Sequence, residues 1–257
     1  MELELKSKVA IVTGATSGIG RATAVRFAKA GASVAIVGRN AKSLKDLASE
    51  IQELGGEALP LRADITGQGK APRIVAQAIR KFGGLDVLVN AAGHIASGDI
   101  ENTKLAVWDA MMEVNLRSVF NLMQAAVPSL AERRGNIVNV SSVTGLRAFP
   151  GVLAYCVSKA AVDQLTRCAS LELAPRGVRV NAVNPGVVVT EIHKRGGMSE
   201  KAYEAFLLHS QTTHPLGRVG MPDEVAELIL YLASDRASWI TGVTYSIDGG
   251  RSQTCAR

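Results

Sequence analysis

Short apolar runs alternate with longer amphipathic stretches along almost the whole chain, and this rhythm limits the folds that the chain can adopt. The first runs, VAIVT at 9–13 and SVAIV at 33–37, are continuous rather than interrupted by polar residues. Continuous runs are typical of strands in a parallel sheet that helices cover on both faces. The pattern therefore predicts repeated βαβ units with right-handed crossovers.

The apolar runs give seven candidate strands: Val9–Thr13, Ser33–Val37, Ala58–Ala63, Val87–Asn90, Asn136–Val140, Val178–Val183 and Val243–Ile247. Helical stretches are predicted between them, near 19–30, 41–54, 67–82, 104–133, 155–174 and 222–233. We expect an α/β fold of the Rossmann type, with a doubly wound parallel seven-stranded sheet and helices on both faces.

No linker, repeat or low-complexity segment divides the 257 residues, so we expect residues 1–257 to form a single domain. One region, at about 187–216, is irregular. Its middle part, 199–209, predicts a short amphipathic helix with Ser199 as the N-cap. An insertion of this kind is more often a lid over a site than a domain of its own.

Composition narrows the classes of function. The net charge is +6, but basic residues are scattered among acidic ones, and we expect no nucleic-acid partner. No stretch approaches the roughly 18 apolar residues of a membrane span, and the first residues lack the apolar core of a signal peptide. The three cysteines, Cys156, Cys168 and Cys255, lack the spacing of metal or redox motifs. We expect free thiols, no metal site and a cytoplasmic location.

The first strand runs directly into TGATSGIG at 13–20, and a helical pattern follows at once. Glycines permit a tight turn and a close approach of the backbone, while a helix N-terminus offers unpaired N–H groups and a positive dipole end. The spacing is G-x-x-x-G-x-G rather than G-x-G-x-x-G. Because the turn follows the first strand, it predicts a site for the diphosphate of a dinucleotide.

The end of the second strand bears on the choice of dinucleotide. An acidic residue there would bind the adenosine ribose hydroxyls and disfavour a 2′-phosphate. This chain instead has Gly38, followed by Arg39 and Asn40. A guanidinium suits a phosphate dianion, so the sequence favours NADP(H) over NAD(H).

Tyr155 and Lys159 form a Y-x-x-x-K pattern on a predicted helix, where residues four apart share a face. A free tyrosine has a pKa near ~10, and a neighbouring ammonium lowers that pKa. The pair is therefore a candidate general acid and base. Ser142 follows the fifth strand, at the edge of the sheet where ligands bind. Asn115 lies within a long predicted helix, where an amide is not a favoured residue.

Taken together, the chain resembles the short-chain dehydrogenase/reductase family over nearly its whole length. The matching pieces are TGATSGIG at 13–20, Asp64-Ile65, Asn90-Ala91-Ala92-Gly93, Asn115, Ser142, Tyr155 with Lys159, Asn184-Pro185-Gly186, Thr190, PLGRVG at 215–220 and Asp248-Gly249-Gly250. Their joint order and spacing carry the resemblance. Ala91 departs from it, because the family has a second Asn there, and the change removes a possible structural hydrogen bond.

The resemblance implies a role for each catalytic residue. Tyr155 would exchange a proton with the substrate oxygen, and Ser142 would hydrogen-bond the same oxygen. Lys159 would hold the nicotinamide ribose hydroxyls and lower the pKa of the tyrosine. Asn115 would anchor a water that links Lys159 to solvent and completes a proton relay.

The resemblance also implies a set of cofactor-binding residues, among which Asp64 would meet the adenine amine and Thr190 the carboxamide. The set comprises Gly14, Thr16, Ser17, Gly18, Ile19, Gly20, Arg39, Asn40, Asp64, Ile65, Asn90, Ala91, Gly93, Tyr155, Lys159, Pro185, Gly186, Val188 and Thr190. Adjacency to the motifs places the substrate against Ser142, His94, Phe149, Val152, Val187 and His193. The two histidines are interpreted as pocket wall, and Asp163 as a residue on the helix surface.

These features predict an NADPH-dependent oxidoreductase that moves a hydride between the cofactor and a carbonyl or secondary alcohol. The substrates left open are 3-oxoacyl thioesters, and small ketones, sugars or polyols in either direction; an NAD-linked dehydrogenase is the rival for the cofactor. A dinucleotide sensor without activity would lack Tyr155, Lys159 or Ser142, and all three are present.

Partners of the chain follow from the resemblance alone. Arg133, Arg134 and Arg176 lie near positions where relatives that act on acyl-carrier protein have a basic docking surface, although basic residues before a strand are common. Family members form tetramers in which the C-terminal tail, here 249–257, packs at a subunit interface. The resemblance therefore implies a homotetramer that acts on a small molecule.

Overall fold

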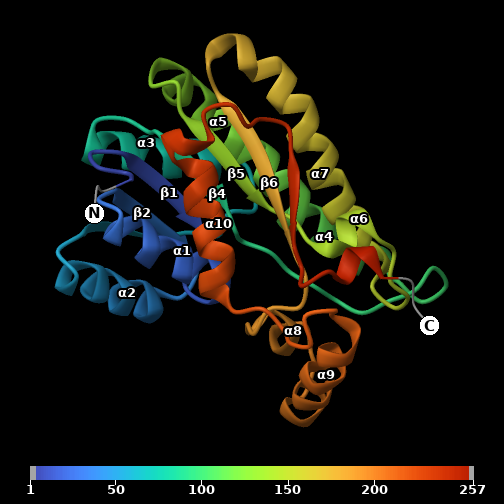
Figure 1. Cartoon of the computed structure of the whole chain (residues 1–257). Coiled ribbons are helices and arrows are strands. Elements are labelled where there is room, and N and C mark those ends of the chain that lie inside the picture. The colour runs from blue at the N-terminus through green and yellow to red at the C-terminus, as the bar shows by residue number, and fades with distance from the viewer. Residues whose placement is uncertain (1–3, 255–257) are drawn as a thin grey trace.

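The computed structural model describes residues 4–254, and its centre is a sheet of seven parallel strands (Figure 1). These are β1 (Val9–Thr13), β2 (Ser33–Gly38), β3 (Glu57–Arg62), β4 (Val87–Asn90), β5 (Asn136–Val140), β6 (Arg179–Pro185) and β7 (Thr244–Ile247). The spatial order is β3-β2-β1-β4-β5-β6-β7, so the direction of winding reverses between β1 and β4. The predicted fold class is confirmed, and every predicted strand is present with its ends moved by at most two residues.

Side chains of the central strands alternate between two apolar layers, which is why β1, β2 and β4 are mostly apolar. The edge strands β3 and β7 are less buried and carry exposed polar residues such as Glu57 and Ser246. In β1, Ala10 and Val12 belong to one buried cluster, whereas Val9 and Ile11 belong to the other. One face is covered by α1 (Gly18–Lys29), α2 (Ala41–Glu53) and α10 (Pro222–Ala233). The opposite face is covered by α3 (Lys70–Phe82), α5 (Ser118–Glu132) and α7 (Leu153–Leu173).

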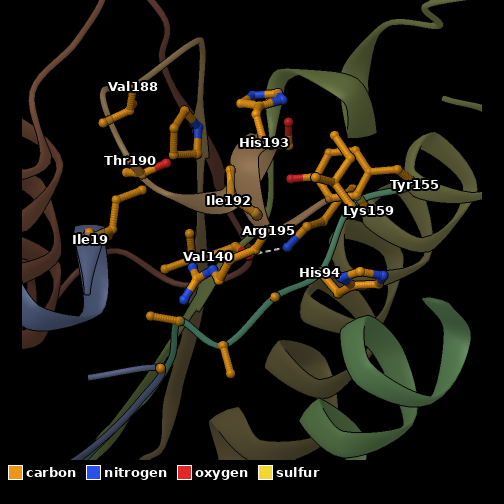
Figure 2. Close-up of a pocket in the computed structure, with 18 of the residues that line it drawn as sticks. Ile19, His94, Val140, Tyr155, Lys159, Val188, Thr190, Ile192, His193 and Arg195 are labelled. Carbon is orange, nitrogen blue, oxygen red and sulfur yellow. Dashed lines mark hydrogen bonds between the residues drawn. The ribbon is translucent and has the colours of Figure 1, made fainter. Parts of the chain in front are cut away.

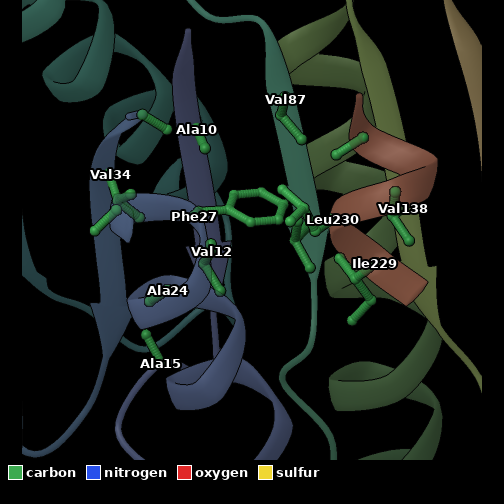
Figure 3. Packing of buried hydrophobic residues seen from close by; sticks show 14 of the residues in the cluster. Ala10, Val12, Ala15, Ala24, Phe27, Val34, Val87, Val138, Ile229 and Leu230 are labelled. Carbon is green, nitrogen blue, oxygen red and sulfur yellow. The ribbon is translucent and has the colours of Figure 1, made fainter. Parts of the chain in front are cut away.

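Small aliphatic side chains fill the layer beneath α1 and α10, as the low aromatic content predicts. Phe27 of α1 is the exception in size, and it is completely buried. Figure 3 shows its ring between the central strands and Leu230 of α10. The ring, in the last turn of α1, thus packs two helices that are distant in sequence against the central strands.

The long helix predicted at 104–133 is not continuous. It consists of α4 (Leu105–Met112), a π-helical segment at Glu113–Arg117 and α5. A π-helical turn holds one more residue than an α-helical turn, and such turns are frequent at functional sites. The extra residue falls around Asn115, whose side chain forms hydrogen bonds with the backbone of His94 in the loop after β4. The prediction of one uninterrupted helix is therefore wrong at this point.

Two short helices were not predicted: α6 (Val143–Leu146) and α8 (Ile192–Arg195). The helix expected at 199–209 is α9 (Glu200–Thr213), and its predicted N-cap is confirmed because Ser199 Oγ accepts from Ala202 N at 3.3 Å. In Figure 1, α8 and α9 lie together, away from the helices that cover the sheet. Single 3₁₀ turns occupy Ala174–Arg176, Asp235–Ala237 and Arg251–Gln253.

Over the described range, no helix is long and apolar enough to cross a membrane. Within 4–254, no group of three or more His, Cys, Asp or Glu side chains is placed to hold a metal ion. Cys156 and Cys168 are free thiols, and Cys255 lies outside the described residues.

Candidate active site

A cavity of about 850 Å³ opens at the carboxyl ends of the central strands, next to the reversal of strand order between β1 and β4. It is lined by residues that follow β1, β2, β3, β4, β5 and β6, together with residues of α8 and α9. A parallel sheet brings the carboxyl ends of its strands to one edge, which is where ligands bind in folds of this type.

The glycine-rich turn forms one wall of the cavity, and its backbone leaves no room for side chains. Gly14 has φ +66°, and a Cβ there would lie 2.8 Å from the carbonyl oxygen of Ala91. A Cβ on Gly20 would lie 2.5 Å from the carbonyl oxygen of Gly14. The turn therefore brings its own backbone to the cavity at the start of α1, an arrangement that fits a diphosphate.

The turn after β4 is tied to β1 by a single hydroxyl group. Thr13 Oγ1 accepts from the backbone nitrogens of Ala91 and Ala92 at 3.1 and 3.2 Å, and lies 3.4 Å from the Val89 oxygen. These bonds hold the turn without any contribution from the side chain at position 91. Although Ala91 stands where the family has a second Asn, the turn keeps its hydrogen bonds to Thr13, because they are made by the backbone nitrogens of residues 91 and 92.

The residues after β2 and β3 lie at the far end of the cavity. Arg39 and Asp64 both line it. The pKa of Asp64 is lowered, first by hydrogen bonds from Thr66 and to a smaller extent by the charge of Arg39. Asn40 does not line the cavity; its Oδ1 accepts from Ser43 N at 3.1 Å and caps α2. The structure thus does not bring Asn40 to the predicted cofactor site.

Ser142, Tyr155 and Lys159 line the same cavity, as predicted from their spacing. Ser142 is the N-cap of α6, directly after β5, and its Oγ accepts from Thr144 N at 3.1 Å. Tyr155 and Lys159 lie one turn apart on α7, with the lysine Nζ 5.7 Å from the centre of the tyrosine ring. Lys159 Nζ donates to the carbonyl oxygen of Val140 at 2.7 Å, the dashed line in Figure 2.

Burial sets the charge state of this group of residues. It raises the pKa of Tyr155 to about 12, although the neighbouring Ser142 side chain acts in the opposite direction. Burial also lowers the pKa of Lys159 to about 8, opposed by the charge of Asp163. The direction for Tyr155 is opposite to the lowered pKa expected from the sequence, because desolvation is the largest effect and the Ser142 side chain offsets only part of it.

Asn115 lies directly behind the cavity and is almost fully buried. Its Oδ1 accepts from His94 N at 2.8 Å, and its Nδ2 donates to His94 O at 2.9 Å and to Ser158 Oγ at 3.0 Å. The amide thus fixes the loop that follows β4 to the start of α7. It positions His94, which does line the cavity.

Asn90 was expected to line the cofactor, but its side chain points into the protein. Its Nδ2 donates to Asn139 Oδ1 at 2.9 Å across the β4–β5 pair. Gly93, three residues later, does line the cavity. A carbon atom added at Gly93 would lie 3.8 Å from Lys159 Nζ, so this glycine keeps the space beside the ammonium open.

Asp163 is buried, which contradicts its interpretation as a surface residue. Its Oδ2 accepts from Asn184 Nδ2 at 2.9 Å, and burial raises its pKa. The residue lies one turn after Lys159 on the same face of α7, and its charge acts on the pKa of that lysine. The four-residue spacing from Tyr155 to Lys159 to Asp163 was the signal that could have predicted this.

Each residue expected at the substrate end lines the cavity, including Phe149, Val152 and Val187. Burial lowers the pKa of both His94 and His193, and for His94 two arginines add to the effect. Both imidazoles are therefore neutral at pH 7, which agrees with their interpretation as pocket wall. Sequence reasoning missed several other lining residues: Val140, Ile192, Arg195, Phe206, His209, Ser210, Thr213 and Arg251.

The segment after β6 is held over the cavity by two side chains that sequence reasoning also missed. Tyr203 of α9 accepts from Thr190 N at 3.1 Å and donates to Thr190 O at 2.8 Å. His214 Nε2 accepts from Val187 N at 3.1 Å. These bonds place Pro185, Gly186, Val188 and Thr190 along the cavity, where they were predicted.

Comparisons with known proteins cover nearly the whole chain. Residues 14–252 match the family model described as "Enoyl-(Acyl carrier protein) reductase". The chain is 42% identical over 249 residues to the "3-oxoacyl-[acyl-carrier-protein] reductase FabG" of Thermotoga maritima, covering 96% of this chain and 99% of the relative. It is 40% identical over 254 residues to the "2,5-dichloro-2,5-cyclohexadiene-1,4-diol dehydrogenase LinX" of Sphingobium indicum, covering 98% and 99%.

Solved structures agree with these relatives. A short-chain dehydrogenase/reductase from Mycobacterium marinum superposes with a TM-score of 0.90 at 36% identity, over 99% of this chain and 98% of that one. A short-chain dehydrogenase/reductase of unknown function from Caenorhabditis elegans, solved with cofactor, superposes with a TM-score of 0.93 at 34% identity, over 98% of each chain.

The buried ammonium makes stability depend on pH in a defined direction. In the folded protein Lys159 has a pKa of about 8, below its ordinary value, so between pH 8 and 10.5 the unfolded chain binds the extra proton. Stability then rises with pH. We expect wild type to gain roughly 3 kcal/mol relative to Lys159→Met between pH 7 and 10.5, measured by urea unfolding. Lys45→Met, on the exposed face of α2, should show the same dependence of unfolding free energy on pH as wild type. The same dependence in Lys159→Met would contradict the lowered pKa of Lys159.

Proposed function

The chain belongs to the short-chain dehydrogenase/reductase family of oxidoreductases, and we propose that it reduces a carbonyl group to a secondary alcohol with NADPH. The observation that carries this proposal is the convergence of Ser142, Tyr155 and Lys159 on one cavity that also contains the glycine-rich turn. The same residues would catalyse the reverse oxidation of an alcohol.

We assign the diphosphate to the glycine-rich turn, the adenosine to Arg39, Asp64 and Ile65, and the nicotinamide to the end of the cavity near Thr190. The close backbone packing of Gly14 and Gly20 supports the first assignment. When bound, the cofactor supplies the hydride that adds to the carbonyl carbon. The protein's part is to hold the two reactants together, an effect worth roughly 7–11 kcal/mol of the barrier.

Tyr155 is the proposed general acid. With a pKa of about 12, its phenol stays protonated at neutral pH, the form that can donate a proton to the carbonyl oxygen. Ser142 Oγ, on the neighbouring loop, would donate a hydrogen bond to the same oxygen. As the carbonyl carbon gains the hydride, its oxygen takes the tyrosine proton and becomes a hydroxyl group.

Lys159 would bind the ribose hydroxyls and return a proton to Tyr155 from solvent. Its side chain is nine-tenths or more buried, and among residues 4–254 its ammonium has one hydrogen bond, to Val140 O, which leaves further donors for a ligand or water. Asn115 is a positioning residue in this scheme. Its bonds to both backbone groups of His94 keep the loop beside Lys159 in place.

Replacing Tyr155 by Phe tests the assignment of the acid. We expect kcat to fall by about 10²- to 10⁴-fold, because general acid help is lost, while the Kd for NADPH changes by less than about twofold. Turnover is followed through nicotinamide absorbance, and Kd through nicotinamide fluorescence. Tyr231→Phe, on α10 outside the cavity, should keep full activity. Full activity in Tyr155→Phe would exclude the assignment.

The preference for NADPH rests on Arg39, whose guanidinium lies at the adenosine end of the cavity. We expect Arg39→Gln to raise the Kd for NADPH by about 10- to 100-fold, since a hydrogen bond to a charged phosphate is lost, and to leave the Kd for NADH nearly unchanged. Arg62→Gln, an exposed arginine on the neighbouring strand end, is the control. A wild-type preference for NADH would reverse our choice of cofactor.

We assign residues 187–216 as a lid of the single domain, since α8 and α9 both contribute side chains to the cavity. We also propose that the chain forms a homotetramer in the cytoplasm. Large apolar side chains on the outer faces of α5 and α7 support the assembly, because Phe120, Val157 and Leu171 are exposed in the single chain.

A second candidate substrate is a 3-oxoacyl thioester on acyl-carrier protein, and the 42% identity to a reductase of that name favours it. Arg133 and Arg176 lie at the ends of helices that lead into β5 and β6, at the edge of the sheet opposite the cavity. Arg133 also donates to Gly83 O at 2.8 Å and lies beside Asp86. A carrier docked there would have to serve the cavity of another subunit.

Arg176→Glu separates this candidate from small-ketone substrates. Arg176 has no ion pair within the described residues, so its reversal tests docking rather than folding. If a carrier docks there, kcat/KM for the carrier-bound thioester should fall at least about tenfold, while kcat/KM for a carrier-free thioester stays the same. Equal effects on the two substrates would argue against a docking surface at Arg176.

A further inference from the structure

Arg195 reaches from α8 into the cavity and contacts the glycine-rich turn. Its Nη1 donates to Ser17 Oγ at 3.0 Å, across 178 residues of sequence. Figure 2 shows its side chain extending into the cavity, between Ile19 and Lys159. Neither the motifs nor the adjacency of residues pointed to Arg195, because it lies in the irregular region after β6.

The contact falls at the start of α1. Ser17 is the N-cap of that helix, yet its hydroxyl makes no capping hydrogen bond and accepts from Arg195 instead. The first turn of α1 contains no acidic residue. The N–H groups of a first turn lack partners within their helix, and they attract anions. The guanidinium is therefore poised where a diphosphate would meet those N–H groups.

The positive charge of Arg195 is compensated only in part by nearby carboxylates. Within residues 4–254, neither Arg195 nor Arg39 forms an ion pair with a carboxylate. Burial and the repulsion from Arg39 lower the pKa of Arg195, and the charge of Glu191 offsets only part of this. The neighbouring Lys194, by contrast, is neutralised by Glu191 and Glu200 and does not line the cavity. An anion between the arginines would remove the repulsion.

We propose that Arg195 is a ligand of the cofactor's diphosphate and that it ties the lid to the bound dinucleotide. The proposal rests on the proposed function, because it assumes that the cavity binds a dinucleotide. A guanidinium suits phosphate oxygens, with which it forms charge-assisted and often bidentate hydrogen bonds. The diphosphate is common to NADPH and NADH, whereas the 2′-phosphate assigned to Arg39 belongs to NADPH alone.

α8 couples this contact to the catalytic end of the cavity. Ile192, at the start of α8, packs against the buried cluster that contains Ile95 and Tyr155. Gly196, just after α8, allows a close approach, since a Cβ there would lie 2.7 Å from the carbonyl oxygen of Ile95. A cofactor that binds Arg195 would thus fix the end of α8 beside the glycine-rich turn. The start of α8 is already held by the packing of Ile192 near Tyr155.

Equilibrium binding of both dinucleotides to Arg195→Gln tests the proposal without any substrate. We expect the Kd values for NADPH and NADH to rise by the same factor, about tenfold or more, because one charged contact to a shared group is lost. Arg195→Lys keeps the charge and should lose less. Lys194→Gln removes the adjacent cation and should change either Kd by less than about twofold. Thermal melting confirms that each variant is folded.

Hydrogen exchange gives a second readout. Adding NADH should slow exchange in residues 187–216 of wild type and of Lys194→Gln, but not of Arg195→Gln at the same cofactor occupancy. Unchanged Kd values for Arg195→Gln, or a loss confined to NADPH, would overturn the assignment to the diphosphate. If the wild-type protein bound neither NADPH nor NADH, the proposed function itself would be overturned. This outcome differs from a failure of the Arg195 proposal, in which the wild type binds and Arg195→Gln binds equally well.

Discussion

The hydrogen bond from the buried Lys159 ammonium to the carbonyl oxygen of Val140 fixes the geometry of the proposed chemistry. It joins α7 to the carboxyl end of β5, so that Tyr155 lies beside the loop that carries Ser142. Burying an ammonium is costly, and Asp163, itself buried, compensates only part of that cost. Charged groups kept at such cost are typical of functional sites, where their altered pKa values serve the reaction.

The fold could be predicted because one physical rule, burial of both sheet faces, dictates the apolar pattern of the central strands β1, β2 and β4. The π-helical segment at 113–117 could not, because its cause is a tertiary contact. Asn115 bonds both backbone groups of His94, a residue 21 positions earlier, and the helix adjusts its hydrogen bonding to allow this. Periodicity within one segment carries no information about such a partner.

Most of the residues expected at strand ends line the cavity, since the topology of a parallel sheet brings those ends together. Two of them, Asn40 and Asn90, do not line it, because their side chains point elsewhere. Asn90 is still inside β4 and points toward Asn139, and Asn40 turns back to cap α2. Asp163 could have been placed from its spacing on α7. Arg195 could not, because no regular pattern relates residue 195 to the turn at 13–20.

The arrangement of charge in the cavity fits the proposed dinucleotide. Arg39 and Arg195 line the cavity, Arg195 beside the glycine-rich turn where we propose that the diphosphate binds, and their charges add to the lowering of the His94 pKa by burial. Farther along, His193 is neutral and packs against Phe206, with ring centres 4.6 Å apart. That wall is built by α8 and α9. A few hydrogen bonds join this region to the rest of the cavity, with Ser17, Tyr203 and His214 as acceptors. Substitutions in this region can therefore change the substrate while the sheet and its catalytic residues stay in place.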